Sequence, residues 1–241
     1  MPQSKLHNFH HITHAHYIIK SVDSQTEIIA KLKNHNPLSS VKDRLAIALI
    51  ESIEKLGLVN EDTVFVEPTN GNTGIDLAFV CAAKGHQLIL VMPESVTKER
   101  IQIAKGLGAT VILTDSSLGM KGSIEKANHM IKQNHNYVMP VQFENLANPE
   151  IHRQTTALEI LEDINGHVDY FVAGIETGGT LTGVGEILKS KIASVKIIAV
   201  EPKDSPVLSG GKLGPHQIQG IGAGFTPSVL NTKGTDQIIT A

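Results

Sequence analysis

The sequence predicts an α/β protein made of two open, twisted domains with mostly parallel sheets. Short apolar segments typical of strands alternate with helical segments of about ten residues along most of the chain. Two glycine-containing turns, Pro68–Gly74 and Gly174–Thr180, each follow a predicted strand and precede a predicted helix. This alternation produces right-handed βαβ crossovers, whose parallel strands are covered by helices. We therefore expect a cleft at the carboxyl ends of the strands, where open α/β sheets bind ligands.

The predicted elements follow from hydrophobic periodicity and from turn residues. In the first half, strands are expected at 27–32, 64–67, 88–92 and 110–113, and helices from Val41 and over 75–84, 98–107 and 123–133. In the second half, we expect a helix at 150–163, a strand at 170–173, a helix at 181–189, and strands at 196–200 and 237–240.

Composition excludes several classes of protein. A net charge of -3 gives no electrostatic reason to expect nucleic acid or an anionic membrane as a partner. No apolar run reaches the roughly 18 residues that span a bilayer, and Met1–Tyr17 has no signal-peptide core. The chain has 1 cysteine, Cys81, so it has no internal disulfide, and we expect a buried structural thiol in a cytoplasmic protein.

Lys42 is the first candidate for chemistry. It lies where a loop meets a predicted helix, next to Asp43 and Arg44. A lysine amine attacks a carbonyl only when it is deprotonated, so a Schiff-base lysine needs a site that lowers its pKa. By itself, the segment fits better with a surface lysine in a first helical turn, with Ser39 or Ser40 as the N-cap.

The two strand-to-helix turns add anion-binding chemistry. Pro68–Gly74 offers free helix-start amides and polar side chains that suit a carboxylate. By itself, the segment is equally compatible with an ordinary polar turn that binds nothing. Gly174–Thr180 is neither a Walker A motif nor a full GxGxxG, and a phosphate-sized anion suits it better than a dinucleotide. A lysine, a carboxylate turn and a phosphate turn are the parts that a pyridoxal-phosphate site requires.

Together these segments resemble the cysteine synthase (O-acetylserine sulfhydrylase) family. Pro37–Arg44 is similar to the family's Pro-Gly-Gly-Ser-Val-Lys-Asp-Arg loop, and Pro68–Gly74 to its Pro-Thr-Ser-Gly-Asn-Thr-Gly. The likeness runs from about Glu27 to the end of the chain. It also includes Gln142–Asn145, Asn148–Arg153 and Asp204–Phe225.

The resemblance implies a tryptophan synthase β-like fold (pyridoxal-phosphate fold type II) with the cofactor in the cleft between two domains. Residues 1–38 and 147–241 would form the larger, cofactor-binding domain, and residues 39–146 a smaller mobile one. The cofactor would be pyridoxal 5'-phosphate, and the reaction the replacement of acetate in O-acetylserine by sulfide to give cysteine. The family also implies a homodimer, and serine acetyltransferase as a partner whose C-terminal tail enters the cleft.

Roles follow only for residues that match the family's motifs. Lys42 would be the Schiff-base lysine and the acid or base at the substrate α-carbon, and Asn72 would bind the cofactor 3′-oxygen. No metal site is implied. The substrate carboxylate would be held by Thr69, Asn70, Thr73 and Gln142, the cofactor phosphate by Thr177, Gly178, Gly179 and Thr180, and the closing mouth would include Gly220 to Gly222.

Four departures from the family pattern bear on activity. Asn70 replaces serine, and Leu38-Ser39 replaces Gly-Gly. Glu176 replaces a glycine in the phosphate turn, where its charge would repel phosphate unless the side chain points to solvent and only its backbone N–H faces the turn. If that glycine has a positive φ, the glutamate is also strained. At the ends, Ile12–Ile19 lacks the family's Gly-Asn-Thr-Pro, and no Ser-Ser-Gly-Ala-Ala segment follows to hold the pyridine nitrogen. The chain therefore reads as truncated, and we expect poor stability or dependence on a partner.

Two alternatives stay open. A catalytically impaired homologue or fragment would keep the fold and a partner-binding role. Cystathionine β-synthase and serine dehydratase share the lysine and the glycine turns, although Gly214–Gly220 fits cysteine synthase best. The N-terminal histidines indicate adventitious metal affinity instead of a metal site: His7, His10, His11, His14 and His16.

Overall fold

The computed structural model describes residues 16–20 and 26–241. Residues 36–141 form one compact unit, and residues 142–241 with the described part of 1–35 form the other. Both units are α/β with parallel sheets, which confirms the predicted fold class. Within the described residues, no helix combines the length and the apolar character that a membrane crossing needs.

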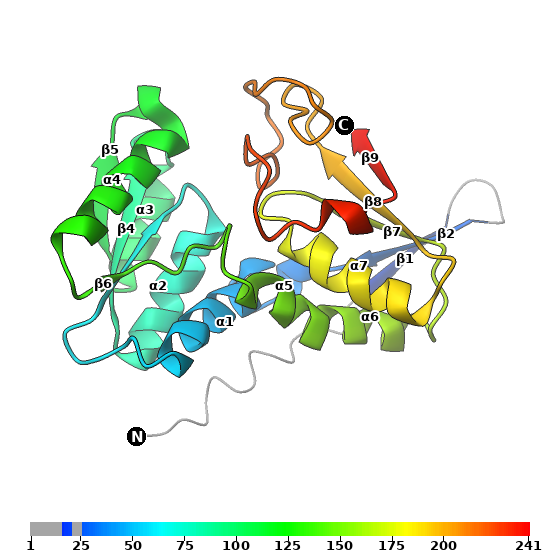
Figure 1. The fold of residues 1–241 in the computed structure, drawn as a ribbon, viewed down its shortest axis with the longest axis horizontal. Helices are drawn as coiled ribbons and strands as arrows, with labels where there is room; N and C mark the ends of the chain where they lie inside the picture. The colour runs from blue at the N-terminus through cyan, green and yellow to red at the C-terminus, as the bar shows by residue number, and fades with distance from the viewer. Residues whose placement is uncertain (1–15, 21–25) are drawn as a thin grey trace. The chain divides into compact units, whose positions relative to one another are not determined.

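The unit of residues 36–141 alternates strands and helices, as Figure 1 shows. Two of its helices begin earlier than the periodicity predicted, because their first turns contain polar and glycine residues that obscure the apolar pattern. A short 3₁₀ turn at Ser116–Leu118 precedes the last helix. The elements are α1 (Lys42–Lys55), β3 (Val64–Pro68), α2 (Asn72–Lys84), β4 (Gln87–Pro93), α3 (Lys98–Gly106), β5 (Thr110–Thr114), α4 (Gly119–Gln133) and β6 (Tyr137–Val138).

The parallel sheet of this unit has the order β5-β4-β3-β6 and carries apolar side chains on both faces. In β4, Ile89 and Val91 pack in the cluster that includes Ala127 and Met130 of α4. The alternate residue Met92 points to the opposite face, where it approaches Gly74 of α2. Helices therefore cover both faces, and β3 and β4 end together beside the start of α2.

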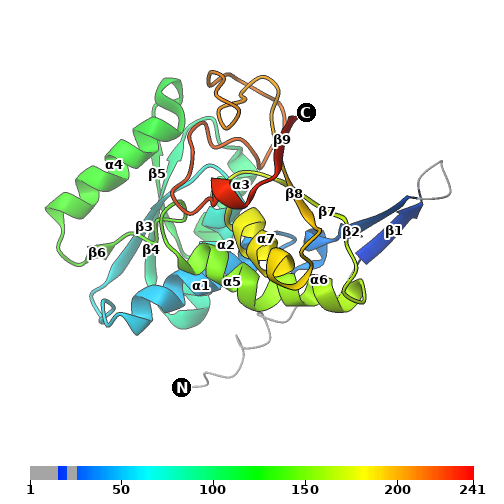
Figure 2. The same cartoon turned by 45° about the vertical axis from the view of Figure 1, so that its right-hand side comes forward.

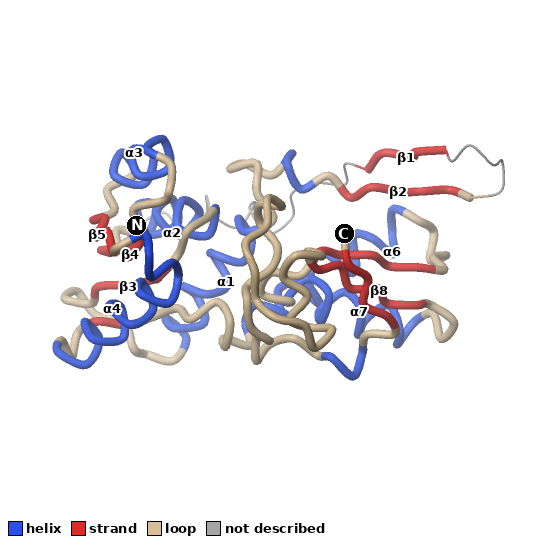
Figure 3. The backbone as a smooth tube through the Cα atoms, turned by 90° about the horizontal axis from the view of Figure 1, so that it is seen from above, coloured by secondary structure: helices blue, strands red, loops and turns tan. Residues whose placement is uncertain are grey.

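The unit containing residues 142–241 is shown by secondary structure in Figure 3. It includes a two-stranded ribbon, three parallel strands and helices on one face of these strands. Short 3₁₀ turns lie at Lys33–His35 and Thr232–Gly234. The elements are β1 (His16–Lys20), β2 (Glu27–Lys31), α5 (Ala147–Ile151), a π-helical turn (His152–Thr156), α6 (Ala157–Asp163), β7 (Tyr170–Gly174), α7 (Gly179–Lys191), β8 (Lys196–Glu201) and β9 (Gln237–Thr240).

The sheet β7-β8-β9 packs against α7 through a buried apolar cluster. Ile197 and Ala199 of β8 meet Val184 and Leu188 of α7 in this cluster. The antiparallel ribbon β1–β2, visible in Figure 2, lies beside α6. Its attachment is ionic, because Lys31 Nζ lies 2.7 Å from the Asp163 carboxylate on α6.

The predicted single helix at 150–163 is wrong in one respect. The helix begins at Ala147, and the π-helical turn His152–Thr156 divides it into α5 and α6. The Thr155 hydroxyl donates to the Ile151 carbonyl at 2.5 Å, which is the local competition that bends helices at threonine. A π-turn adds one residue without disturbing the apolar pattern on either side, so periodicity does not detect it.

Gly183 of α7 permits a close approach of two backbones. A Cβ at this position would lie 2.2 Å from the Pro149 carbonyl oxygen and 2.8 Å from His152 Cβ. The α7 helix can therefore pack directly against α5 and the π-turn only without a side chain here.

We predict that Gly183→Ala lowers the free energy of unfolding by about 1–3 kcal/mol. Overpacking costs about that much and exceeds the helix-propensity gain of about 1 kcal/mol. The matched control is Gly106→Ala in α3, where a Cβ meets nothing within 4 Å. Urea unfolding should show a loss for the first variant and no loss for the control. Equal midpoints would contradict the packing argument.

Candidate active site

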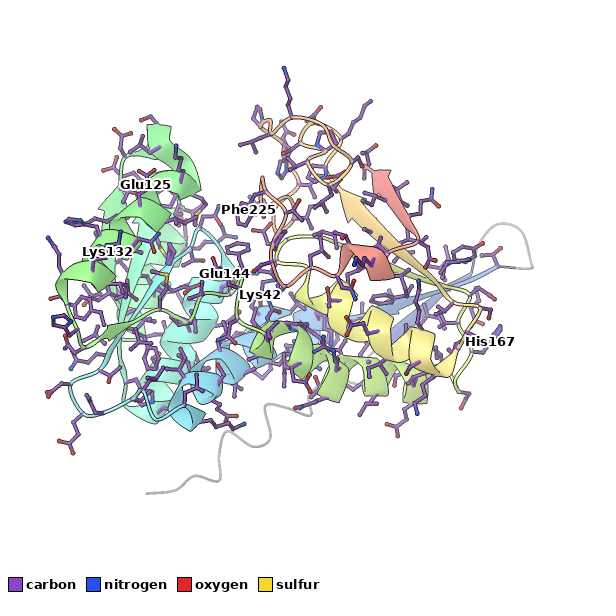
Figure 4. The ribbon with its side chains drawn as sticks, in the orientation of Figure 1. Lys42, Glu125, Lys132, Glu144, His167 and Phe225 are labelled. Carbon is purple, nitrogen blue, oxygen red and sulfur yellow. The ribbon has the colours of Figure 1, made fainter. Side chains whose placement is uncertain are left out.

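Lys42 is the first residue of α1, and Figure 4 labels its side chain. Its backbone N–H donates to Ser40 Oγ at 3.0 Å, and the Asn36 side-chain amide donates to the Ser40 carbonyl at 2.6 Å. The Leu38 N–H donates to the Asp43 carboxylate at 2.8 Å. These bonds fix the loop on both sides of the lysine, so its backbone position is well defined.

Ser39 shows how the chain accommodates the replacement of glycine in this loop. Its φ is 57°, in the left-handed region that glycine adopts without steric cost. Its N–H donates to the Asn36 carbonyl at 2.7 Å. The loop therefore keeps a conformation typical of glycine, at a strain on the order of 1 kcal/mol.

The turn between β3 and α2 carries the residues predicted to hold a carboxylate. Thr69 is buried, and its hydroxyl accepts a hydrogen bond from the Gly71 N–H at 3.3 Å. Asn70 and Asn72 are exposed, and Thr73 is buried in the first turn of α2. The first N–H groups of a helix have no intrahelical acceptor, so this turn can bind an anion.

Asp76, one turn into α2, connects this turn with the lysine. It is 1% exposed, and neither of its carboxyl oxygens makes a hydrogen bond of normal geometry. Burial and the nearby Asp43 carboxylate raise its pKa to about 8, while Ser40 and the Lys42 ammonium act in the opposite direction. Helices α1 and α2 pack against each other, and Asp43, Ser40 and Lys42 at the start of α1 are the groups that act on Asp76. Lys42 and the Thr69–Thr73 turn therefore belong to one region of this unit.

The other unit contains the predicted phosphate turn, at the start of α7. Gly178 has a φ of 82°, and a Cβ on Gly179 would lie 1.8 Å from Asn148 Oδ1. The Thr177 hydroxyl accepts from Asn148 Nδ2 at 3.0 Å, and Thr180 Oγ1 lies 3.2 Å from His152 Nε2. Polar side chains of α5 and of the π-turn thus hold Thr177 and Thr180 of the phosphate turn in place.

This turn fits a phosphate group. Glycine is required at Gly178 for its φ and at Gly179 for space, and the first-turn amides of α7 lack intrahelical acceptors. The buried Asn148 Oδ1 has no hydrogen-bond partner in the protein. Backbone N–H groups, the helix dipole and the hydroxyls of Thr177 and Thr180 are the donors that hold phosphate at a helix start.

Gln142 and the segment 220–222 belong to the same unit as this turn. Gln142 is buried, and its main-chain carbonyl accepts a hydrogen bond from Asn148 Nδ2 at 2.8 Å. The Gly222 N–H donates to the Ile175 carbonyl at 2.7 Å, which joins the 220–222 segment to the residues before the phosphate turn. Gly220 itself is exposed, with a φ of 87°.

The residue after Gln142 links it to the C-terminal part of this unit. The Phe143 ring packs edge-to-face on Phe225, which Figure 4 labels, with 5.0 Å between the ring centroids. The Ser228 hydroxyl also donates to the Phe143 carbonyl at 2.9 Å. Segments 142–143 and 225–228 therefore lie together.

Three buried polar residues of these regions were not predicted as site residues: Asn148, His152 and Asp76. Asn148 and His152 lie inside a quoted family segment, but nothing in their local pattern shows that they support the phosphate turn. Asp76 had a visible signal, because an acidic residue interrupts an otherwise apolar helix. A buried carboxyl with no basic partner in its own turn is unusual and indicates a function.

The remaining candidates lie outside the two regions. Cys81 is buried, as predicted, and burial and the nearby Glu54 raise its pKa to about 12. The predictions for His7, His10, His11 and His14 fall outside the described residues, as does the side chain of His16. Among the described residues, no group of three or more metal-binding side chains occurs.

Comparison with known proteins supports one family. The model of the family "Pyridoxal-phosphate dependent enzyme" matches residues 13–240. A cysteine synthase of Staphylococcus aureus is 50% identical over 218 residues, which are 90% of this chain and 70% of that protein. The chain belongs to the cysteine synthase family of pyridoxal-phosphate-dependent enzymes. 

Solved structures agree with this assignment. The cysteine synthase of Entamoeba histolytica has a TM-score of 0.93 and 40% identity, covering 100% of this chain and 74% of that one. A hydrogen sulfide-producing enzyme of Fusobacterium nucleatum has a TM-score of 0.91 and 42% identity, covering 100% and 80% of the two chains. The resemblance identified from the sequence motifs is confirmed.

Glu176 is the departure from this family's pattern that lies nearest the phosphate turn. The positive φ values among the described non-glycine residues belong to Ser39, Val141 and Asn165, so Glu176 carries no such strain. Its half-buried side chain lines a small cavity that also contains Glu201 and Phe225. The remaining consequence is electrostatic, because the carboxylate is two residues from Gly178.

We predict that Glu176→Gln tightens the binding of pyridoxal phosphate about fivefold. This corresponds to the loss of a repulsion of about 1 kcal/mol between unit charges in a water-like dielectric. Fluorescence titration at low and high salt measures the effect, which should shrink as salt increases. Glu162→Gln on the exposed end of α6 is the control for net charge. An unchanged affinity in both variants would show that the Glu176 carboxylate does not act on the phosphate.

Proposed function

We propose that this chain is a cysteine synthase that replaces the acetate of O-acetylserine by sulfide to give cysteine, with pyridoxal 5'-phosphate as cofactor. The observation that carries the proposal is the combination of a fixed lysine loop and two anion-binding helix starts in a chain of this family. A catalytically impaired homologue with only a binding role is not favoured, because relatives of high identity are cysteine synthases.

We propose that the phosphate turn holds the cofactor phosphate through Thr177, Gly178, Gly179 and Thr180. Asn148 and His152 keep this turn in place from behind, because they bond to its two threonine hydroxyls. Asn72 binds the cofactor 3′-oxygen. When bound, pyridoxal phosphate supplies an electron sink for negative charge at the substrate α-carbon.

The amino-acid substrate is held by its α-carboxylate at the start of α2. Thr69, Asn70 and Thr73 offer hydroxyl, amide and N–H donors there, and the family resemblance gives the Gln142 amide the same role. Lys42 anchors the cofactor and then takes or returns the proton at the substrate α-carbon. Gly220 lies in the segment that closes over the substrate, where its missing side chain leaves the backbone free to move.

The larger assembly follows the family. Residues 1–38 and 147–241 act as the cofactor-binding domain, and residues 39–146 as the mobile one. We propose a homodimer in the cytoplasm, with serine acetyltransferase as a protein partner. Gel filtration with light scattering tests the dimer.

We predict that Lys42→Ala abolishes covalent cofactor binding and lowers cysteine formation by at least about a thousandfold, since it removes both the covalent anchor and the acid-base group. Purified wild-type protein with pyridoxal phosphate should give the visible-edge absorption of a lysine-linked cofactor. O-acetylserine should shift that band, and adding sulfide should produce cysteine.

The matched control is Lys55→Ala, at the exposed end of the same helix. It should keep the absorption band, and borohydride reduction should still attach the cofactor to a peptide containing Lys42. A folded wild-type protein that shows no band, or a band that survives in Lys42→Ala, would refute the proposed function.

A further inference from the structure

Two buried carboxyl groups, Asp43 beside Lys42 in α1 and Asp76 in α2, act on each other electrostatically. Asp43 is 3% exposed and Asp76 is 1% exposed. They come from different helices, since α1 and α2 pack against each other in this unit. Two buried carboxylates at close range repel each other and are both poorly solvated, so one of them takes up a proton.

The hydrogen bonds indicate which carboxyl group holds the proton. Burial raises the pKa of Asp43, but its carboxylate accepts from the Leu38 N–H at 2.8 Å, and this bond and the adjacent Arg44 guanidinium favour its ionised form. Neither oxygen of Asp76 makes a hydrogen bond of normal geometry. The stabilising donors therefore belong to Asp43, and the neutral acid is Asp76.

Other charged groups near Asp76 do not change this assignment. From α1, Asp43 and Lys42 act on it, and they do so with opposite signs. The packed strand β4 contains no titratable side chain. The charged residues of α3 lie at or near the surface: Lys98, Glu99, Arg100 and Lys105.

We propose that Asp76 is a positioning residue for Lys42: it stays protonated and thereby limits the negative charge beside the lysine to the single carboxylate of Asp43. This inference rests on the proposed role of Lys42 as the lysine that binds the cofactor. A second carboxylate at this place would stabilise the Lys42 ammonium, and only the free amine attacks a carbonyl. The protonated acid thus keeps the amine available at neutral pH.

The same arrangement makes stability depend on pH. The Asp76 pKa is raised from 3.8 to about 8, so the folded protein binds one proton more than the unfolded chain between these values. Stability from this group is therefore complete below about pH 4 and is lost as pH rises to about 8. Replacement of the acid by an amide of the same shape should remove that loss.

The experiment compares the wild type with Asp76→Asn in two measurements. First, Lys42 is trapped with pyridoxal phosphate and borohydride over a pH series, and the modified peptide is quantified by mass spectrometry. The two proteins should be trapped equally at about pH 6 to 7, because the amide has the same charge as the protonated acid. Asp76→Asn should be trapped more readily only from about pH 8, where the wild-type acid ionises. A difference already at about pH 6, or no difference at any pH, would overturn the proposal.

Second, thermal unfolding without cofactor is measured over the same pH series. The stability gained by Asp76→Asn relative to the wild type should grow steadily between about pH 4 and about pH 8. Asp62→Asn, an exposed acid in the same unit, should show no such growth. A constant difference between wild type and Asp76→Asn would reject the buried protonated acid, whether or not the protein is a cysteine synthase.

The wild type alone provides a third measurement if Asp76→Asn does not fold. Its infrared spectrum should contain the C=O band of a protonated carboxyl at neutral pH, and this band should disappear near pH 8. The absence of any carboxyl titrating above about pH 6 would overturn the proposal. Because this measurement needs neither cofactor nor substrate, a failure of the proposed function leaves its result interpretable.

Discussion

The direct contact between α7 and the backbone of residues 147–153 is the constraint on which the unit of residues 142–241 depends. Two glycines of α7, Gly179 and Gly183, leave no room for a side chain between the helices. This contact brings Asn148 and His152 within hydrogen-bond distance of the turn at the helix start. The phosphate turn is therefore rigid because of helix packing, and its anion-binding geometry exists before any ligand arrives.

The loop that carries Lys42 is also fixed, but by hydrogen bonds within the loop instead of by helix packing. Its loop is held by Asn36, Ser40 and Asp43, and it includes a serine in a left-handed conformation. The strain at Ser39 is small compared with the hydrogen bonds that surround it. A loop fixed in this way keeps the lysine in place despite the loss of the family's glycines.

The order of elements was predictable from the sequence, because strands and helices alternate with clear apolar patterns and glycine turns. The motifs proposed to bind carboxylate and phosphate were also visible, since Thr69–Gly74 and Thr177–Thr180 combine glycines with hydroxyl and amide side chains. The π-turn was not predictable, because one extra residue leaves the flanking patterns intact. The support given by His152 was likewise hidden, since it depends on the packing of α5 against α7. Asp76 was visible in the sequence as an acidic residue in an apolar helix, but its interaction with Asp43 became visible only in the structure.

The π-turn also gives this chain a place where its length can change. Each residue of an α-helix turns the chain by about 100°, so a deletion in a regular helix rotates everything that follows it. A π-turn holds one residue more than an α-turn, so deletion of its exposed residue Gln154 would restore a regular helix without that rotation. Ala157 would stay in the apolar cluster, and the Asp163 carboxylate would stay near Lys31. Deletion of Gln154 should therefore be better tolerated than deletion of a residue within α7.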